Sequence, residues 1–186
     1  MRILHLTQKD YKTSAWSGGT TTELFIWPRG ADYAKREFAF RISSAVVELE
    51  QSDFTPLAGV ERWITPLQGG FTLTHPGKEP VVMGSLAQPY RFSGEEATHC
   101  VGRATDFNLM LKGVAGEMRL CRNFAAVGIG FNCFYAPGPV MVMLDKDYSL
   151  AEGDLLVIFS LNNAVAQLEG EAVLACHVEV EGWENS

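Results

Sequence analysis

The stretch Phe71-Thr-Leu-Thr-His-Pro-Gly77 decides the fold class, because apolar and polar residues alternate strictly in it and then stop at a Pro-Gly turn signal. Successive side chains of a β-strand point to opposite faces, so this alternation is typical of a strand with one buried face. Apolar segments of similar length recur along the chain at roughly 8–12-residue spacing. Eighteen glycines and eight prolines punctuate the sequence. The pattern predicts an all-β protein, a sandwich or a barrel, of about ten or more strands.

The other strand-sized segments follow the same rhythm. They are Ala39–Val46, Val81–Met83, Thr98–Val101, Phe107–Leu111, Val140–Leu144, Leu155–Phe159, Ala164–Leu168 and Ala172–Val178. Only Ala31–Glu37 is compatible with a helix, of one or two turns. A chain of 186 residues has the length of one domain or of two small halves. Because residues 63–112 and 131–180 share a strand rhythm, we expect an N-terminal half over 1–112 and a C-terminal half over 113–186, without a flexible linker.

The charge balance limits the classes of partner. Fifteen basic and 22 acidic side chains give a net charge of −7, which disfavours nucleic acid and anionic membranes as partners. No apolar run approaches the roughly 20 residues that span a bilayer, and the N-terminus lacks the apolar stretch of a secretion signal. Four scattered cysteines without a CxxC pair predict free thiols in a reducing compartment. We therefore expect a cytoplasmic protein.

Trp16–Leu24, with the sequence WSGGTTTEL, is the most unusual segment. Its two glycines allow close approach of the backbone to a ligand, and its threonines place hydroxyl groups beside Glu23. No lysine follows the glycines, so a phosphate-binding loop is poorly supported. A tight turn followed by a β-branched strand is an equally good interpretation.

Two arginines are candidates for an internal anion site. Arg41 interrupts an apolar strand, and an inward-facing guanidinium there requires a carboxylate partner or an anionic ligand. Arg62 follows a turn, with Glu61 expected on the opposite face of its strand. Asp106 and Asn108, two residues apart, would share one strand face and could line a polar pocket. The alternatives are solvent-facing arginines, an Asp106 that closes a turn and an Asn108 that bonds to the backbone.

Metal and nucleophile chemistry have weak support. The four histidines, His5, His75, His99 and His177, are isolated and form no closely spaced pair. His99 and Cys100 are adjacent, so on a strand they point to opposite faces and cannot easily share an ion. No GxSxG motif surrounds Ser17. We expect neither a metal nor another cofactor.

Five ordered motifs, which span the first two-thirds of the chain, make the sequence resemble the HutD/Ves family of metal-free double cupins. The motifs are Trp16–Leu24, Phe40–Ser43, Phe54 to Arg62 with its Gly-Val-Glu-Arg end, Pro89–Gly94 and Thr105–Met110. The resemblance implies cupin-type double-stranded β-helix (jelly-roll) barrels, two halves packed as a compact bicupin, with a pocket in the N-terminal barrel. It further implies ligand-binding roles for Trp16, Thr22, Glu23, Arg41, Ser43, Glu61, Arg62, Asp106 and Asn108.

Members of this family are linked with histidine utilisation, where they are thought to sense an intermediate such as urocanate or formylated glutamate. The resemblance therefore implies a cytoplasmic protein that binds a small anionic molecule, in a role that is not firmly enzymatic, and we assign no catalytic residues. In this reading Arg41 and Arg62 pair with a ligand carboxylate, while Glu23 and Asp106 hold those arginines or accept an N–H. The alternatives are a metal-independent isomerase or lyase, with Glu23 or Asp106 as the base, and a structural or interaction module. By analogy with other cupins, a homodimer would cover exposed strand edges.

Overall fold

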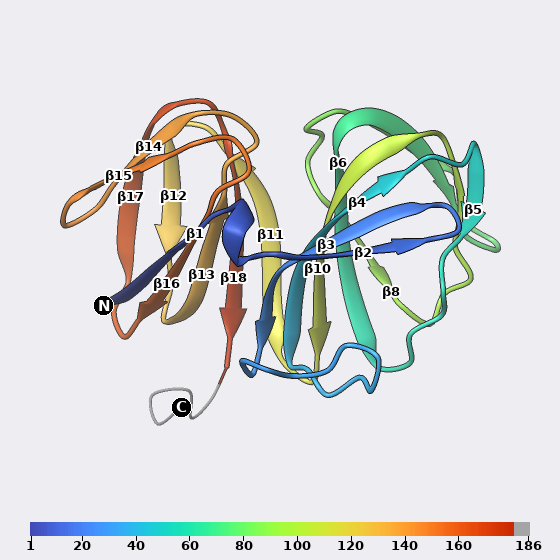
Figure 1. The fold of residues 1–186 in the computed structure, drawn as a ribbon, viewed down its shortest axis with the longest axis horizontal. Helices are drawn as coiled ribbons and strands as arrows, with labels where there is room; N and C mark the ends of the chain where they lie inside the picture. The colour runs from blue at the N-terminus through green and yellow to red at the C-terminus, as the bar shows by residue number, and fades with distance from the viewer. Residues whose placement is uncertain (181–186) are drawn as a thin grey trace. The chain divides into compact units, whose positions relative to one another are not determined.

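The computed structural model describes residues 1–180, and these are almost entirely β-structure, as the sequence predicts (Figure 1). The short 3₁₀-helix η1 covers Gln8–Asp10. The strands are β1 Arg2–Leu6, β2 Lys12–Trp16, β3 Gly19–Trp27, β4 Phe40–Val47, β5 Gln51–Asp53, β6 Val60–Thr74, β7 Val81–Gly84, β8 Tyr90–Ser93, β9 His99–Val101, β10 Ala104–Lys112, β11 Ala115–Cys121, β12 Phe124–Val127, β13 Gly130–Tyr135, β14 Val140–Met143, β15 Asp147–Leu150, β16 Leu155–Ser160, β17 Ala164–Gly170 and β18 Val173–Glu179. None of the helices in this part of the chain is long and apolar enough to cross a membrane.

The chain divides into two units, and the division differs from the expected one at the N-terminus. Residues 12–113 form one unit, so the boundary after Gly113 lies next to the expected one. Residues 1–11, expected in the N-terminal half, belong instead to the unit that begins at Val114. The reason is backbone pairing: β1 runs antiparallel to β16, with Leu4 opposite Val157.

The first unit, residues 12–113, is built on the sheet order β2-β3-β4-β10-β6-β9-β5, with β7 and β8 also paired to β6. The long, curved β6 holds this unit together (Figure 1), because its first half pairs with β10 and β8 and its second half with β7 and β9. The change of partner falls near Gly69 and Gly70. Gly69 has a φ of 75°, and a Cβ on Gly70 would lie 2.8 Å from the Met83 carbonyl oxygen, so neither position accommodates a side chain.

The second unit has two sheets of its own, ordered β1-β16-β13-β18-β11 and β12-β17-β14-β15. Its core includes Phe134, Leu156, Ile158 and Val173, all fully buried. Strands β13 and β16 are buried along their whole length, so neither shows an alternation of apolar and polar residues, and β16 is apolar from Leu155 to Phe159.

Ala31–Glu37, the segment whose sequence is compatible with one or two helical turns, forms turns and no helix. The Arg36 N–H donates to the Tyr33 carbonyl oxygen at 3.0 Å, and Arg36 itself has a φ of 60°. A left-handed residue cannot continue a right-handed helix. This loop matters for the site, because it carries Tyr33.

Candidate functional site

A cavity of about 390 Å³ lies within the first unit. Its wall is formed by one face of β4, β10 and β6, together with the β2–β3 hairpin, β5 and the loops that carry Tyr33 and Phe54. The lining residues are Ser14, Trp16, Thr21, Tyr33, Arg41, Ser43, Ala45, Val47, Ser52, Asp53, Phe54, Thr55, Leu57, Arg62, Asp106, Asn108 and Met110. Six of the nine residues that the sequence indicated are among them.

Arg41 is held in the wall by β4 with only 6% of its surface exposed. Its Nε donates to Glu23 Oε2 at 2.8 Å, and its Nη1 donates to Ser43 Oγ at 3.2 Å. The guanidinium also lies over the Tyr33 ring, 4.1 Å from its centroid. One carboxylate and one ring therefore fix this cation before any ligand arrives.

Arg62, on β6, is 7% exposed and donates fewer side-chain hydrogen bonds to the protein than Arg41 does. Its Nη2 donates to Asn108 Oδ1 at 3.1 Å, whereas its buried Nε has no hydrogen-bond partner. The guanidinium lies over two rings, 4.7 Å from the centroid of Phe54 and 5.2 Å from that of Phe92. Burial lowers the pKa of Arg62, and the nearby charge of Asp106 opposes that shift. A buried N–H without an acceptor costs free energy, which a hydrogen bond to an acceptor would recover.

Asp106 lies deep in the same wall, with 4% of its surface exposed. Asn108 Nδ2 donates to Asp106 Oδ1 at 2.5 Å, so Asn108 connects the carboxyl group to Arg62. Burial raises the pKa of Asp106 to about 7, because removal from water penalises the charged form more than Arg62 and the hydrogen bonds favour it. Both protonation states of this group are therefore accessible near neutral pH.

Strand alternation explains why Asp106, Asn108 and Met110 share the wall. They are two residues apart on β10, and this shared face is what the sequence predicted. The register of β10 on β6 shifts between Thr105 and Asp106. The pairing of β10 with β4 has no such shift and is continuous from Ala104 to Leu111.

Three of the residues that the sequence indicated do not line the cavity. Glu23 acts on it only through Arg41. Thr22 lies on the opposite side of β3 from Thr21, and its Oγ1 is 2.9 Å from Thr13 Oγ1 on the neighbouring strand. A ligand role for Thr22 in this cavity is therefore not supported.

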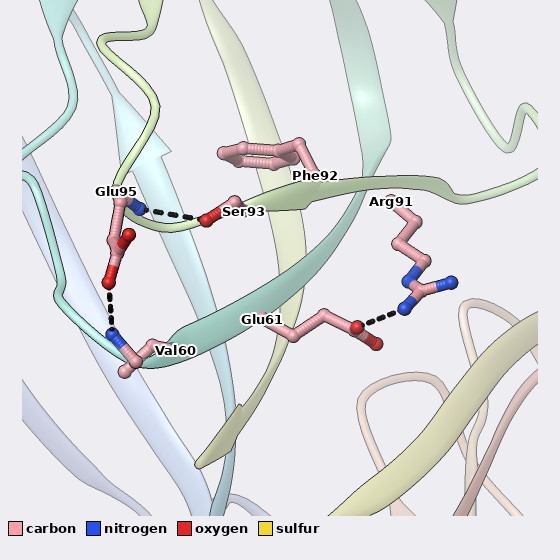
Figure 2. A pocket seen from close by; sticks show the side chains of 7 residues that line it. Val60, Glu61, Arg91, Phe92, Ser93 and Glu95 are labelled. Atoms are coloured by element: carbon pink, nitrogen blue, oxygen red, sulfur yellow. Dashed lines mark hydrogen bonds and ion pairs between the residues drawn. The ribbon is translucent and has the colours of Figure 1, made fainter. Parts of the chain in front are cut away.

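Glu61 alternates with Arg62 and belongs to a second, surface cavity (Figure 2). There its carboxylate accepts hydrogen bonds from Arg91 Nη2 and from Trp63 Nε1, and Figure 2 shows the Glu61 and Arg91 side chains directed toward each other. Glu95, in the same cavity, accepts from the Gly59 N–H at 2.9 Å. Because its carboxylates are already bonded to the protein, we place the candidate site in the internal cavity.

Sequence reasoning missed Tyr33 and assigned no role to Phe54. Their rings cover the two guanidinium groups, and they reach the wall from loops. Phe54 begins one of the family motifs, so the sequence contained an indication that this residue belongs to the site. Tyr33 lies in a turn segment without periodicity, and nothing in the sequence pointed to it.

Within residues 1–180, no group of three His, Cys, Asp or Glu side chains is placed to hold a metal ion. Each of the four histidines has a different side-chain partner: Asp154 for His5, Thr98 for His75, Asp53 for His99 and Asn132 for His177. The buried polar side chains in the cavity wall are two guanidinium groups, an amide, a hydroxyl and a carboxyl group, from Arg41, Arg62, Asn108, Ser43 and Asp106.

The fold and this cavity define a cupin-like protein with an internal, arginine-lined site. The structure superposes on HutD from Pseudomonas fluorescens SBW25 with a TM-score of 0.80 and 23% identity, over 96% of this chain and 100% of that one. It matches the conserved protein PA5104 from Pseudomonas aeruginosa PAO1 equally well, with a TM-score of 0.80 and 24% identity over 97% and 100% of the two chains. The bacterial pirin YhhW from Escherichia coli, solved in complex with nickel(II), has a TM-score of 0.61 at 11% identity, over 94% and 97%.

These likenesses establish the all-β, bicupin-type fold that the family resemblance implied. The HutD family model matches residues 8–176. The chain belongs to the HutD family. No curated protein sequence matches it.

Proposed function

We propose that this protein binds a small carboxylate in the internal cavity and acts by recognition rather than by catalysis. The observation that carries the proposal is the pair of inward guanidinium groups, Arg41 and Arg62, in one cavity wall. Burying two cations costs free energy unless anions compensate them, and Glu23 is committed to Arg41. Arg62 therefore has the stronger demand for an anionic ligand.

The proposed ligand has a carboxylate at one end and a polar group at the other. Arg62 Nε is a donor without an acceptor, and Asn108, Ser43 and Asp106 supply hydrogen-bonding groups nearby. Urocanate and N-formylglutamate both fit this description and agree with membership of a family associated with histidine utilisation. We propose these two compounds as candidates and modulation of histidine catabolism as the role.

The direct test is isothermal titration of the purified protein with urocanate and with N-formylglutamate, supported by ligand-induced shifts in Tm. We expect at least one compound to bind wild type, and Arg62→Gln or Arg41→Gln to weaken binding by about 10- to 100-fold, the value of one charge-assisted hydrogen-bond pair. Arg91→Gln is the matched control, since Arg91 is exposed and pairs with Glu61 outside the cavity. Wild-type affinity in both cavity variants, with circular dichroism showing a native fold, would place the site elsewhere.

A second candidate function is a metal-independent isomerase or lyase. It is favoured by Asp106, whose pKa of about 7 is suited to a general base at neutral pH. Incubating the protein with the same two acids and EDTA, and following the reaction by proton NMR, distinguishes catalysis from binding. Product formation that disappears in Asp106→Asn would favour the enzyme; unchanged acids in the presence of demonstrated binding would favour recognition.

A further inference from the structure

The charges around the cavity form two unequal sets. In the first, Arg41 Nε lies 2.8 Å from Glu23 Oε2, and the net charge of this pair is zero whether or not the cavity holds a ligand. In the second, Arg62 is linked through Asn108 to Asp106. The second set is neutral when Asp106 is ionised and carries one positive charge when Asp106 is protonated.

An anion that binds at Arg62 would therefore compete with the carboxylate of Asp106. Two negative charges sharing one buried guanidinium repel each other strongly, because little water remains to screen them. Protonation of Asp106 removes that repulsion and turns its carboxyl group into a hydrogen-bond donor. The same residue then supports the ligand that it would otherwise exclude.

We propose that an anion binds at Arg62 only while Asp106 is protonated, so that the cavity takes up one proton, on Asp106, whenever Asp106 is ionised before the anion binds. This inference rests on the proposed function and adds to it a mode of regulation: occupancy of the site falls as pH rises above neutrality. The geometry that carries it is the buried connection Arg62–Asn108–Asp106 in the wall of a cavity that can admit a ligand.

The other titratable groups around Asp106 do not account for proton uptake on ligand binding. Arg62 on β6 remains a cation across the physiological range, because a guanidinium group is not deprotonated in proteins. Arg41 on β4 is paired with Glu23. The Cys100 thiol on β9 responds to the charge of Asp106, but burial raises its pKa to about 11. Tyr33 lies over Arg41, and the Asp53–His99 pair, with Asp53 largely exposed, lies at the edge of the cavity. His99, the partner of the cavity-lining Asp53, is therefore the position of the control substitution.

The experiment measures affinity and proton uptake together. Wild type is titrated calorimetrically with N-formylglutamate, which does not titrate between pH 6 and 9, in buffers of different ionisation enthalpy; urocanate is titrated in parallel. We expect affinity to fall above the pKa of about 7, approaching tenfold per pH unit, with uptake of nearly one proton at pH 8.5. Asp106→Asn should bind with an affinity that does not fall in this way, and the difference between the two proteins removes any titration of the ligand itself. His99→Gln should keep the wild-type pH dependence.

The outcomes separate the two proposals. Binding by wild type without proton uptake, or Asp106→Asn with the wild-type pH slope, would overturn the coupling and leave the binding function standing. If His99→Gln loses the pH dependence of ligand affinity, that dependence belongs to the Asp53–His99 pair, and the role proposed for Asp106 is overturned. Failure of both compounds to bind wild type at every pH would overturn the proposed function, and the coupling with it.

Discussion

Arg41 and Arg62 share one cross-strand neighbour: Met110 on β10 is the register partner of Arg41 on β4 and of Arg62 on β6. Strand partners on adjacent strands point to the same face, so the three side chains form one row across the sheet. Two residues away, Asn108 pairs in the same way with Ser43. The cationic wall of the cavity is thus a direct product of β-sheet register.

The raised pKa of Asp106 predicts how the free energy of unfolding depends on pH. In the folded state this group keeps its proton up to about pH 7, while in the unfolded chain it loses the proton near pH 4. The folded state therefore binds more protons between these values, and stability falls as pH rises through that window. The contribution of Asp106 is on the order of 4 kcal/mol as an upper value. Urea unfolding at pH 5, 7 and 9 checks this, and Asp106→Asn should lose that component of the slope; equal slopes in both proteins would contradict the assignment.

Glu23 is expected to act as a positioning residue for Arg41. Replacing Glu23 with Gln removes the charge of a partner that holds Arg41 Nε, so we expect ligand affinity to fall about tenfold while the fold is retained. Glu61→Gln is the matched control, because Glu61 has the same chemistry but pairs with Arg91 outside the cavity. Calorimetric titration of both variants is the measurement, and an equal loss in the two would argue against a specific role for Glu23.

Trp16 is expected to report ligand binding by fluorescence. It lines the cavity from the β2–β3 hairpin, and 42% of its surface remains exposed. A ligand that covers it removes water from the indole, so its emission should shift to shorter wavelength on binding. Trp16→Phe should abolish this change, whereas Trp63→Phe should retain it because Trp63 does not line the cavity.

Gly18 is expected to control the position of Trp16. A Cβ at Gly18 would lie 2.1 Å from Trp16 Cζ3, so Gly18→Ala must displace the indole. We expect red-shifted Trp16 emission and weaker ligand binding in this variant. Gly84→Ala is the control, since a Cβ there meets nothing within 4 Å, and it should behave like wild type. Unchanged emission and affinity in Gly18→Ala would show that the ring does not depend on this contact.

The rings over the guanidinium groups are expected to stabilise the fold as well as the site. Phe54→Leu keeps an apolar side chain near Arg62 but removes the aromatic face, and should cost about 0.5–2 kcal/mol of unfolding free energy. Chemical denaturation of wild type and Phe54→Leu gives this difference. A change close to zero would mean that the cation–π contact is not a significant part of the free energy.

Local patterns accounted for most of the architecture and part of the site. Strict alternation in Phe71–His75 and the spacing of turn residues predicted an all-β chain, because a period of two is a property of every strand regardless of its neighbours. The same alternation placed Asp106, Asn108 and Met110 on one face and separated Glu61 from Arg62. The arginines attracted attention because a cation in an apolar strand needs a partner.

What the sequence alone determined was therefore the strand content, the family and the short list of polar residues worth following. Only the tertiary structure decided that β1 completes the C-terminal unit, that Thr22 faces Thr13, that Tyr33 and Phe54 cover the arginines, and that the buried Nε of Arg62 has no hydrogen-bond partner. The reason is physical. Periodicity is local, whereas strand pairing and burial join residues far apart along the chain, and it is burial that raises the pKa of Asp106 and leaves Arg62 Nε without a hydrogen-bond partner.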